Sequence, residues 1–303
     1  MSSGARMGIR SHVRRATSGW QPSRNLRGSV QEATELLKSV GDAVVLTGAG
    51  LSTGSGVPDY RGPGSIRATP MLYQDFVSDP LARQRYWARN YQGWWKLSQA
   101  KPNEGHRALA RWERRARPGV LLGVITQNVD GLHEAAGTRQ LITLHGRSAD
   151  VVCLRCQRVE ARAHLQQRLA ELNPAVAVND RLGPAELRPD ADAEVEDWQG
   201  FTVPDCFHCG GLLKPDVVFF GETVPKPRVA AAFAWCEAAS VIVVAGSSLT
   251  VMSGLRFVRR MAHRGVPIII INHGATRADE LATVRLDGDT AALLPALVDP
   301  AVH

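Results

Sequence analysis

The chain has 303 residues, of which 44% are hydrophobic, and its formal net charge is +7. This length suits one large domain or two modest ones, and no apolar run approaches the roughly 20 residues of a membrane-spanning helix, so we expect a soluble globular protein. Most of the excess positive charge lies in residues 1–31, which contain arginines but no acidic residue. The rest of the chain is close to neutral, which argues against a nucleic-acid-binding surface.

The basic N-terminal segment has two interpretations. We expect residues 1–28 to form a disordered tail, with Met7 as an alternative start of translation. An acid-free segment that is rich in arginine and serine also resembles a mitochondrial transit peptide. The abundance of arginine, alanine and glycine favours a bacterial source, so the expected location is the bacterial cytoplasm, with the mitochondrial matrix as the alternative.

Apolar segments of strand length alternate with helical patterns along the chain. A helix is expected over residues 29–40, since apolar residues recur there at helical spacing and Gly41 follows. Residues 71–116, 227–239 and 251–264 are also expected to be helical. The predicted strands are residues 43–50, 120–128, 141–146, 216–222, 240–248 and 266–273.

These elements predict an α/β fold with a doubly wound, Rossmann-type parallel sheet that is covered by helices on both faces. We assign residues 29–70, 119–148 and 213–303 to this domain. Residues 71–118, a helical insertion, and residues 149–212, a cysteine-bearing module, would form a smaller domain. Polar motifs follow the predicted strands, at the carboxyl ends where such sheets bind ligands.

The first of these motifs is "TGAGLSTGSGVPDYRG", residues 47–62. Gly48 and Gly50 follow a strand, so the backbone could approach a pyrophosphate and aim its N–H groups at it. A tight strand–helix connection would look similar. The spacing differs from the G-x-G-x-x-G of dehydrogenases, and no acidic residue clearly ends the next strand, where a dehydrogenase would bind the adenosine ribose.

Two further motifs end neighbouring strands. "TQNVDGLH", residues 126–133, could bind a ribose hydroxyl or a carboxamide through Gln127, Asn128 and Asp130, or it could be a helix cap and a turn. His145 ends the strand "LITLH" and titrates in the range of a general base, although a hydrogen-bonded core histidine is an alternative.

Four of the five cysteines form two Cys-x-x-Cys pairs, Cys153/Cys156 and Cys206/Cys209. In a reducing compartment such pairs indicate metal ligands rather than disulfides. Four thiolates suit one structural Zn²⁺ in tetrahedral geometry. Cys236 lies in an apolar helix and is expected to be a small buried residue.

Taken together, these motifs resemble the sirtuins, the NAD-dependent protein-lysine deacylases. The segments "GAGLS", "PDYR", "TQNVDGLH", "LHG", the paired cysteines, "VVFFGE", "GSSLTV" and "IN" occur in the order of that family, over residues 29–298. "YQDFV", "RQRYWARNYQGWW" and "VMSGLRF" resemble the class II branch most closely, which includes a mitochondrial lipoamidase and ADP-ribosyltransferase.

The resemblance implies roles for the matching positions. His145 would be the catalytic base, with Asn128 and Asp130 beside it in the nicotinamide–ribose pocket. Val218 and Phe219 would line the tunnel for the substrate lysine. Tyr60 stands where the family usually has phenylalanine. The residues expected to bind NAD are Gly48, Ala49, Gly50, Ser52, Asp59, Tyr60, Arg61, Gln127, Asn128, Asp130, Gly246, Ser247, Ser248, Asn272 and Thr290.

The implied reaction transfers the acyl group of a modified lysine to ADP-ribose and releases nicotinamide. Acyl-lysine proteins or peptides are the expected partners of a monomer that binds neither nucleic acid nor membrane. A mono-ADP-ribosyltransferase using the same NAD site is the alternative function, and a zinc module with a vestigial nucleotide pocket is a third. Tyr86 and Arg89 could select an acidic acyl chain, as a similar pair does in the desuccinylase branch, or could belong to an ordinary amphipathic helix.

Overall fold

The computed structural model describes residues 28–60, 70–115, 119–176, 187–188, 192–193 and 198–299. The tail predicted over residues 1–28, including the transit-peptide alternative, lies outside these residues except for Gly28, and Arg61 also lies outside them. Within the described residues, no helix combines the length and the apolar character that crossing a bilayer requires.

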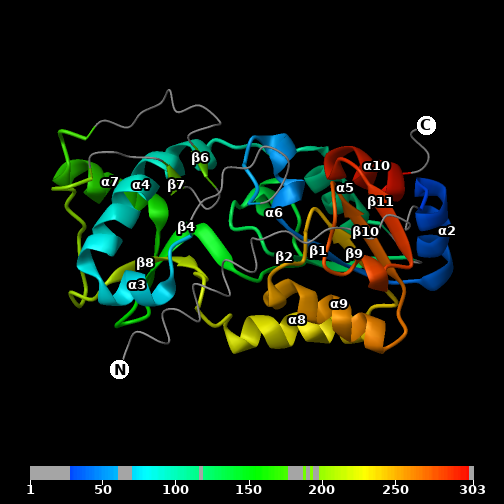
Figure 1. The fold of residues 1–303 in the computed structure, drawn as a ribbon. Helices are drawn as coiled ribbons and strands as arrows, with labels where there is room; N and C mark the ends of the chain where they lie inside the picture. Colours follow the sequence, from blue (N-terminus) through cyan, green and yellow to red (C-terminus); the bar gives the residue numbers. More distant parts are fainter. Residues whose placement is uncertain are drawn as a thin grey trace.

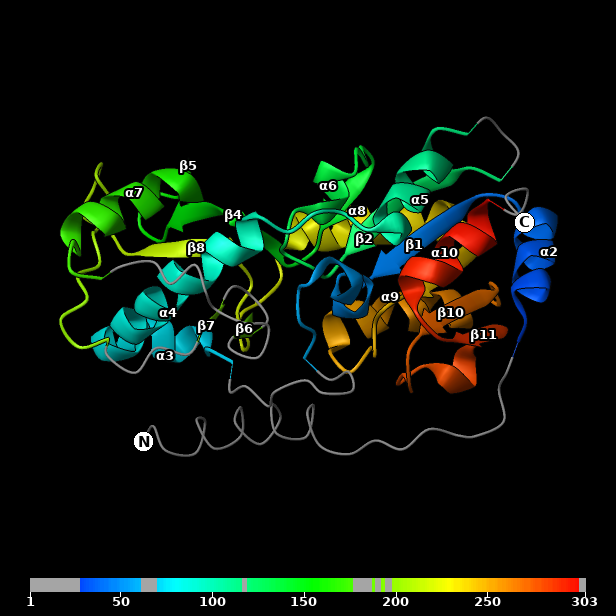
Figure 2. The same cartoon turned by 90° about the horizontal axis from the view of Figure 1, so that it is seen from above.

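The larger lobe is built on a six-stranded sheet in which all neighbouring strands are parallel (Figures 1 and 2). In spatial order its strands are β11 (Val284–Asp287), β10 (Ile268–Asn272), β9 (Val241–Ala245), β1 (Ala43–Thr47), β2 (Leu121–Thr126) and β3 (Leu141–Thr143). Five of the six strands predicted from the sequence therefore belong to this sheet. β1, β2, β9 and β10 fill most of their predicted ranges, whereas β3 fills only the first half of the range 141–146.

Helices cover both faces of the sheet, which confirms the predicted doubly wound architecture. Ala43 and Val45 of β1 pack against one layer, and Val44 and Leu46 pack against the other. The first layer contains α2 (Val30–Val40), α5 (Glu104–Glu113) and α10 (Thr290–Val298), and the second contains α8 (Lys226–Ala238) and α9 (Met252–His263). Because successive side chains of a strand point to opposite faces, a run without polar residues is what a doubly covered strand requires.

Local sequence fixes where these helices begin. The Ser29 hydroxyl accepts a hydrogen bond from the Glu32 N–H at 3.1 Å, and the Glu32 carboxylate accepts one from the Ser29 N–H at 2.6 Å. This capping box satisfies two N–H groups that have no partner within α2. Asp79 caps α4 (Pro80–Ser98) by accepting from the N–H groups of Leu81 and Ala82.

The smaller lobe contains an antiparallel sheet of three strands. β4 (Gly146–Cys153) lies between β5 (Val159–Ala161) and β8 (Leu213–Val217). Its hydrophobic core joins this sheet to aromatic residues of α3 (Tyr73–Ser78) and α4 and to leucines of α7 (Arg162–Leu172). A short pair of strands, β6 (Leu187–Arg188) and β7 (Asp192–Ala193), completes the lobe.

Short elements connect these parts near the cleft. They are the 3₁₀ helices η1 (Ala49–Leu51), η2 (Thr53–Ser55) and η4 (Asp279–Leu281) and the four-residue helix α6 (Leu132–Ala135).

The prediction that residues 216–222 form a strand of the parallel sheet is wrong. Only Asp216 and Val217 are in a strand, β8, and that strand pairs antiparallel with β4. The apolar run divides between the two cores, because Val217 and Phe219 pack in the smaller lobe while Val218 packs against the larger one. An uninterrupted apolar run looks the same whether it crosses between two cores or lies within one.

The sixth strand of the large sheet, β11, was not predicted. Its sequence, "VRLD", contains two charged residues and does not resemble a buried strand. Arg285 is nevertheless buried, and its guanidinium lies 3.1 Å from the carboxylate of Asp279, which is buried as well. A buried charge of this kind is tolerated when it is paired and hydrogen-bonded.

Candidate active site

The strand order of the large sheet reverses at β1, which marks the position of the cleft. The chain continues from β1 to β2 and β3 on one side, while β9, β10 and β11 extend on the other. Connections that leave neighbouring strands in opposite directions open a crevice at their carboxyl ends. The loops after β1 and β9 meet at this point, since the Gly50 N–H donates to the Gly246 carbonyl oxygen at 2.8 Å.

Glycine is required where these two loops touch. A Cβ on Gly48 would lie 2.8 Å from the Gly246 carbonyl oxygen. Gly246 has a φ of 67°, and a Cβ there would lie 2.2 Å from the Leu51 nitrogen. The glycines therefore let the two backbone segments approach closely at the carboxyl ends of β1 and β9.

Ser52, Asn128 and Asp130 form one hydrogen-bonded cluster at the carboxyl ends of β1 and β2. The Ser52 hydroxyl donates to Asp130 Oδ2 at 2.7 Å and accepts from Asn128 Nδ2 at 3.0 Å. Asn128 also donates to the Gly48 carbonyl oxygen at 3.0 Å. Burial raises the pKa of Asp130. The hydrogen bonds that Asp130 accepts from Ser52 and from the Leu132 N–H lower the pKa and offset part of this increase.

His145 lies in the loop between β3 and β4, at the boundary of the two lobes. Its Nδ1 is 3.0 Å from the Gln127 carbonyl oxygen, and its Nε2 is 2.8 Å from the Ser253 hydroxyl. A carbonyl oxygen only accepts, so Nδ1 carries the proton in the neutral ring and Nε2 keeps the lone pair. His145 is thus a neutral imidazole whose accepting nitrogen points to the start of α9.

Burial lowers the pKa of His145 to about 4, because an imidazolium would lose its hydration there. The hydrogen bond to the Gln127 carbonyl oxygen acts in the opposite sense, and the positive charges of Arg256 and Arg228 lower the pKa further. The ring is therefore unprotonated near neutral pH and able to accept a proton.

The glycine that follows His145 is also needed by the geometry. Gly146 has a φ of 87°, and a Cβ there would lie 1.8 Å from the Asp216 carbonyl oxygen. This close approach of β4 to β8 turns the chain out of the large sheet directly after His145. The Val218 N–H then donates back to the His145 carbonyl oxygen at 2.7 Å.

Two more histidines lie buried behind the cluster of Ser52, Asn128 and Asp130. The rings of His106 and His133 are 4.9 Å apart between centroids, and His133 Nε2 is 2.9 Å from the Thr47 hydroxyl. His106 Nε2 is 3.5 Å from the Ser52 hydroxyl. Burial lowers the pKa of His106 to about 4 and that of His133 well below its usual range.

We expect His106, His133 and His145, whose pKa values are all lowered, to make the protein less stable in mild acid. Their folded-state pKa values lie below the value of about 6.5 for an exposed histidine, so the unfolded chain binds more protons as the pH falls below 6.5. At pH 5, His106 and His145 would each reduce the free energy of unfolding by about 2 kcal/mol. Denaturant unfolding at pH 7.5 and pH 5.0 measures this loss.

His106→Asn should reduce the dependence of the unfolding free energy on pH. His263→Gln, a change at an exposed histidine at the end of α9, should leave it unaltered. Equal unfolding free energies for the wild-type protein at the two pH values would contradict this assignment of neutral, buried rings.

Most of the remaining residues predicted to contact NAD lie after the carboxyl ends of β1, β2, β9 and β10 or at the start of α10. Ser247 donates to Gln127 Oε1 at 2.6 Å, and Ser248 lies 3.0 Å from the Thr250 hydroxyl. The Asn272 amide donates to the His273 and Gly274 carbonyl oxygens. Thr290 is buried at the start of α10 and donates to the Gly50 carbonyl oxygen at 2.9 Å, so its hydroxyl already has a partner within the protein.

Of the loop that follows, Asp59 and Tyr60 are described and Arg61 is not. Both described residues are partly exposed, and the Tyr60 ring centroid lies 6.2 Å from that of Phe220. This contact brings the loop after β1 close to the segment that follows β8. Ala49 begins η1, between the two glycines of the loop.

The predicted substrate residues occupy two environments. Val218 is partly buried against the larger lobe, whereas Phe219 is buried in the smaller lobe, with its ring centroid 5.1 Å from Tyr86 and 5.2 Å from Phe76. Glu222 holds this loop by accepting from the Phe219 N–H at 2.8 Å and from buried Lys214 at 3.2 Å. The two side chains therefore face opposite cores, one on each side of the chain.

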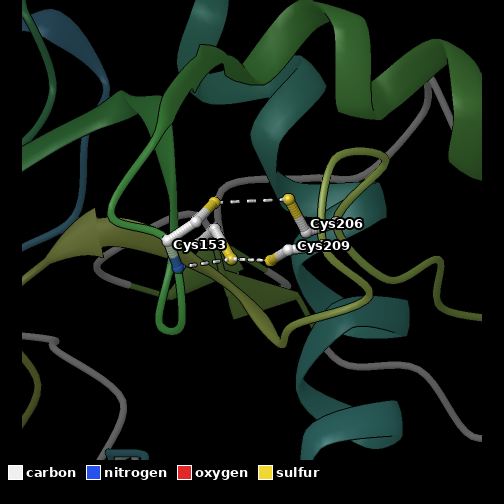
Figure 3. A group of neighbouring side chains, drawn as sticks. Cys153, Cys206 and Cys209 are labelled. Atoms are coloured by element: carbon white, nitrogen blue, oxygen red, sulfur yellow. Dashed lines mark hydrogen bonds between the residues drawn. The ribbon is translucent and has the colours of Figure 1, made fainter.

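The four paired cysteines converge in the smaller lobe, and Figure 3 labels three of them, Cys153 at the end of β4 and Cys206 and Cys209 on a separate loop. Their sulfur atoms all lie within 4.8 Å of one another, with 3.5 Å between Cys153 and Cys209 and 3.8 Å between Cys156 and Cys206. A tetrahedral Zn²⁺ with sulfur bonds of ~2.3 Å places its ligands about 3.8 Å apart. A Cβ on Gly211 would lie 2.9 Å from Cys153 Sγ, so this glycine leaves room for the sulfur atoms.

Several residues of the site were not found from the sequence. Ser253 belongs to "VMSGLRF", which we used only as a mark of subfamily, and His133 belongs to "TQNVDGLH" without an assigned role. His106 carries no local pattern that distinguishes it from other helical histidines. Each of the three acts by contacting a residue far away in the sequence, which a linear pattern does not report.

Comparison with known proteins gives a consistent result. The Sir2 family model matches residues 48–253. An NAD-dependent protein deacetylase of Mycobacterium avium is 53% identical over 256 residues, which cover 84% of this chain and 90% of the relative. A protein of the same name from Streptomyces coelicolor is 48% identical over 278 residues, which cover 90% of this chain and 91% of the relative.

Solved structures show the same similarity. A Sir2 protein in complex with a p53 peptide and NAD⁺ is 30% identical, with a TM-score of 0.71, and the match covers 90% of this chain and 99% of that one. Another solved structure, of Sir2Tm bound to a propionylated peptide, is 28% identical with a TM-score of 0.68, and the match covers 90% of this chain and 99% of that one.

Proposed function

Since the chain belongs to the Sir2 family and is an NAD-dependent protein-lysine deacylase, we propose that His145 is its general base. We also propose that Asn128 and Asp130, which Ser52 orients, hold the nicotinamide–ribose end of NAD. The observation that carries the first proposal is the neutral ring of His145, whose Nε2 is an acceptor at the boundary of the two lobes. A general base must be unprotonated at the working pH, and it is most effective when its pKa lies near that pH.

The residues at the switch point fit a dinucleotide. The glycine loops after β1 and β9 lie against each other at the switch point, where the Gly50 N–H donates to the Gly246 carbonyl oxygen. Peptide N–H groups in such loops suit a pyrophosphate. When it is bound, NAD supplies an electrophilic sugar carbon and a leaving group, nicotinamide.

The protein's own residues would prepare the reaction in three ways. Asn128 and Asp130 are held by Ser52 in fixed orientations, so they can orient a bound carboxamide or ribose with little loss of side-chain entropy. Gln127 fixes the tautomer of His145 through its backbone and contacts Ser247 through its side chain. His145 Nε2 would accept a proton from a ribose hydroxyl, either through the Ser253 hydroxyl, which lies 2.8 Å from this nitrogen, or directly once that hydroxyl turns away.

We propose that the acyl-lysine peptide binds as an extended strand between residues 218–222 and 246–251. Both segments follow strands of neighbouring sheets, and Val218 is joined to the backbone of His145. An added strand gains affinity from main-chain hydrogen bonds and so needs little sequence preference. Sir2 proteins solved with a p53 peptide or a propionylated peptide are consistent with this substrate class.

For the acyl group, we propose that α4 forms the end of the lysine route. Tyr86 packs against Phe219, so a side chain that passes this loop would next meet the face of α4 that also bears Arg89. An arginine in this place would favour an acidic acyl chain such as succinyl or glutaryl. The class II assignment within the family, which rests on "RQRYWARNYQGWW" and "VMSGLRF", favours a larger chain such as lipoyl instead.

Release of nicotinamide from NAD tests the function and the acyl preference together. We expect release to require an acylated peptide and to vary across acetyl, succinyl, glutaryl, lipoyl and long-chain lysines. The unmodified peptide is the control. Release that is equal with and without acylated peptide, together with labelling of protein by ADP-ribose, would indicate an ADP-ribosyltransferase. Absence of release with every peptide would contradict the enzyme assignment.

A further inference from the structure

We propose that Ser253 is a positioning residue for His145, whose hydroxyl holds the proton-accepting nitrogen in place and disfavours the charged ring. This inference rests on the proposed role of His145 as the base. The Ser253 hydroxyl lies 2.8 Å from His145 Nε2, and the two residues are separated by 108 positions in the sequence. Only 8% of the Ser253 surface is exposed, so water competes weakly for this contact.

The position of Ser253 is fixed by the first turn of α9. Ser253 is the second residue of the helix, and its carbonyl oxygen accepts from the Arg256 guanidinium at 3.1 Å. A Cβ on Gly254, the next residue, would lie 2.8 Å from Gln127 Nε2, so the helix packs directly against Gln127. The backbone carbonyl oxygen of the same Gln127 accepts a hydrogen bond from His145 Nδ1–H.

The imidazole is therefore held at both nitrogens, by the Gln127 backbone on one side and by the Ser253 side chain on the other. The Gln127 carbonyl oxygen requires a proton on Nδ1, and the Ser253 hydroxyl then donates to the lone pair of Nε2. A ring rotated by half a turn would lose both hydrogen bonds. The two hydrogen bonds fix the orientation of the ring and the direction of Nε2. A general base is more effective when it is oriented before its substrate binds.

The hydrogen bond from Ser253 also disfavours protonation of His145. As a donor, the hydroxyl needs the lone pair of Nε2, which exists only in the neutral ring, and protonation would force it to turn and accept instead. The charged groups that face the ring act in the same sense. They are Arg256 from α9 and Arg228 from α8, the latter paired with Asp216 of β8 at 2.9 Å.

Ser253→Ala tests the proposal, with Ser253→Thr as the variant that keeps the hydroxyl. We expect Ser253→Ala to lower kcat about tenfold and to change the KM for NAD less than twofold, because the ring loses orientation while the crevice is unaltered. The acid limb of kcat/KM should move to higher pH, since protonation is no longer opposed by the hydroxyl. Ser253→Thr should restore both values.

A second measurement does not depend on activity. In the wild-type protein labelled with ¹⁵N-histidine, NMR should show His145 as the neutral tautomer with its proton on Nδ1. Ser253→Ala should shift the tautomer mixture and raise the pKa of the ring. Should Ser253→Ala fold poorly, Ser253→Gly removes the same hydroxyl. Ser39→Ala removes an exposed hydroxyl from α2 that donates to the Leu36 carbonyl oxygen, and it is the control for a serine change on a helix.

The outcomes separate the two proposals. A wild-type acid limb and an unchanged tautomer in both Ser253→Ala and Ser253→Gly would overturn the role of Ser253. An active His145→Ala variant would instead remove the base assignment on which it rests. A tenfold loss of kcat without a moved acid limb would make Ser253 a packing residue only, and that result also counts against the proposal.

Discussion

We expect His145→Ala to lower kcat for deacylation by about 10² to 10⁴, the range that a positioned general base contributes. The His145 ring lies between Gln127 and Ser253, and it is neutral near pH 7 because desolvation lowers its pKa to about 4. Alanine removes the acceptor and supplies nothing in its place. Single-turnover measurements with an acetylated peptide and saturating NAD give the rate of the chemical step.

The fold should survive this substitution. The Gln127 carbonyl oxygen and the Ser253 hydroxyl each lose one partner, which costs about 1–3 kcal/mol per buried group. Circular dichroism should therefore be unchanged, and calorimetry should still detect NAD binding, because the glycine loops and the cluster around Ser52 are unaltered. His263→Ala, at the exposed end of α9, is the matched control and should retain wild-type kcat. A folded His145→Ala variant with normal turnover would eliminate His145 as the base.

The second large effect is expected from the zinc cluster. Cys153→Ser should abolish stoichiometric zinc binding and lower the melting temperature by roughly 10 °C or more. Cys153 ends β4, and Cys206 and Cys209 belong to the loop that leads into β8, so the metal closes the end of the three-stranded sheet. Both Cys153 and Cys206 are also members of the smaller lobe's hydrophobic core, which would be loosened with the loop.

Atomic absorption gives the metal content for this test, and calorimetric unfolding gives the stability. Cys236→Ala is the control, because Cys236 is buried in α8 and is not part of the sulfur cluster. It should keep one zinc per chain and lose only the stability expected for a small cavity. Full zinc content and an unchanged melting temperature in Cys153→Ser would show that the cluster does not stabilise the lobe.

The sequence predicted the large sheet because its central strands are buried on both faces. Residues such as Val44 and Val45 of β1 pack in opposite directions, and only an uninterrupted apolar segment can satisfy both layers. The same criterion placed residues 216–222 in the wrong sheet and omitted β11. In both places the environment of the segment, two cores for the first and a buried ion pair for the second, comes from distant parts of the chain.

The residue types of the candidate site could be predicted, whereas their connections could not. The linear sequence is enough to recognise paired cysteines, a histidine at a strand end and glycines after a strand. The contact of Ser253 with His145 depends on how α9 packs against Gln127, and the burial that lowers the pKa of His145 depends on both lobes. Such properties arise only when the strands are assembled.

The close approach of Gly146 to Asp216 has a mechanical consequence. The chain leaves the large sheet immediately after His145, and it returns at Val218, which is bonded to the His145 backbone. Two crossings between the lobes therefore run side by side next to the imidazole. A rotation of one lobe against the other about these two crossings would move atoms near the crossings least. The space between the lobes would then widen for a larger acyl chain while the His145 ring moves little.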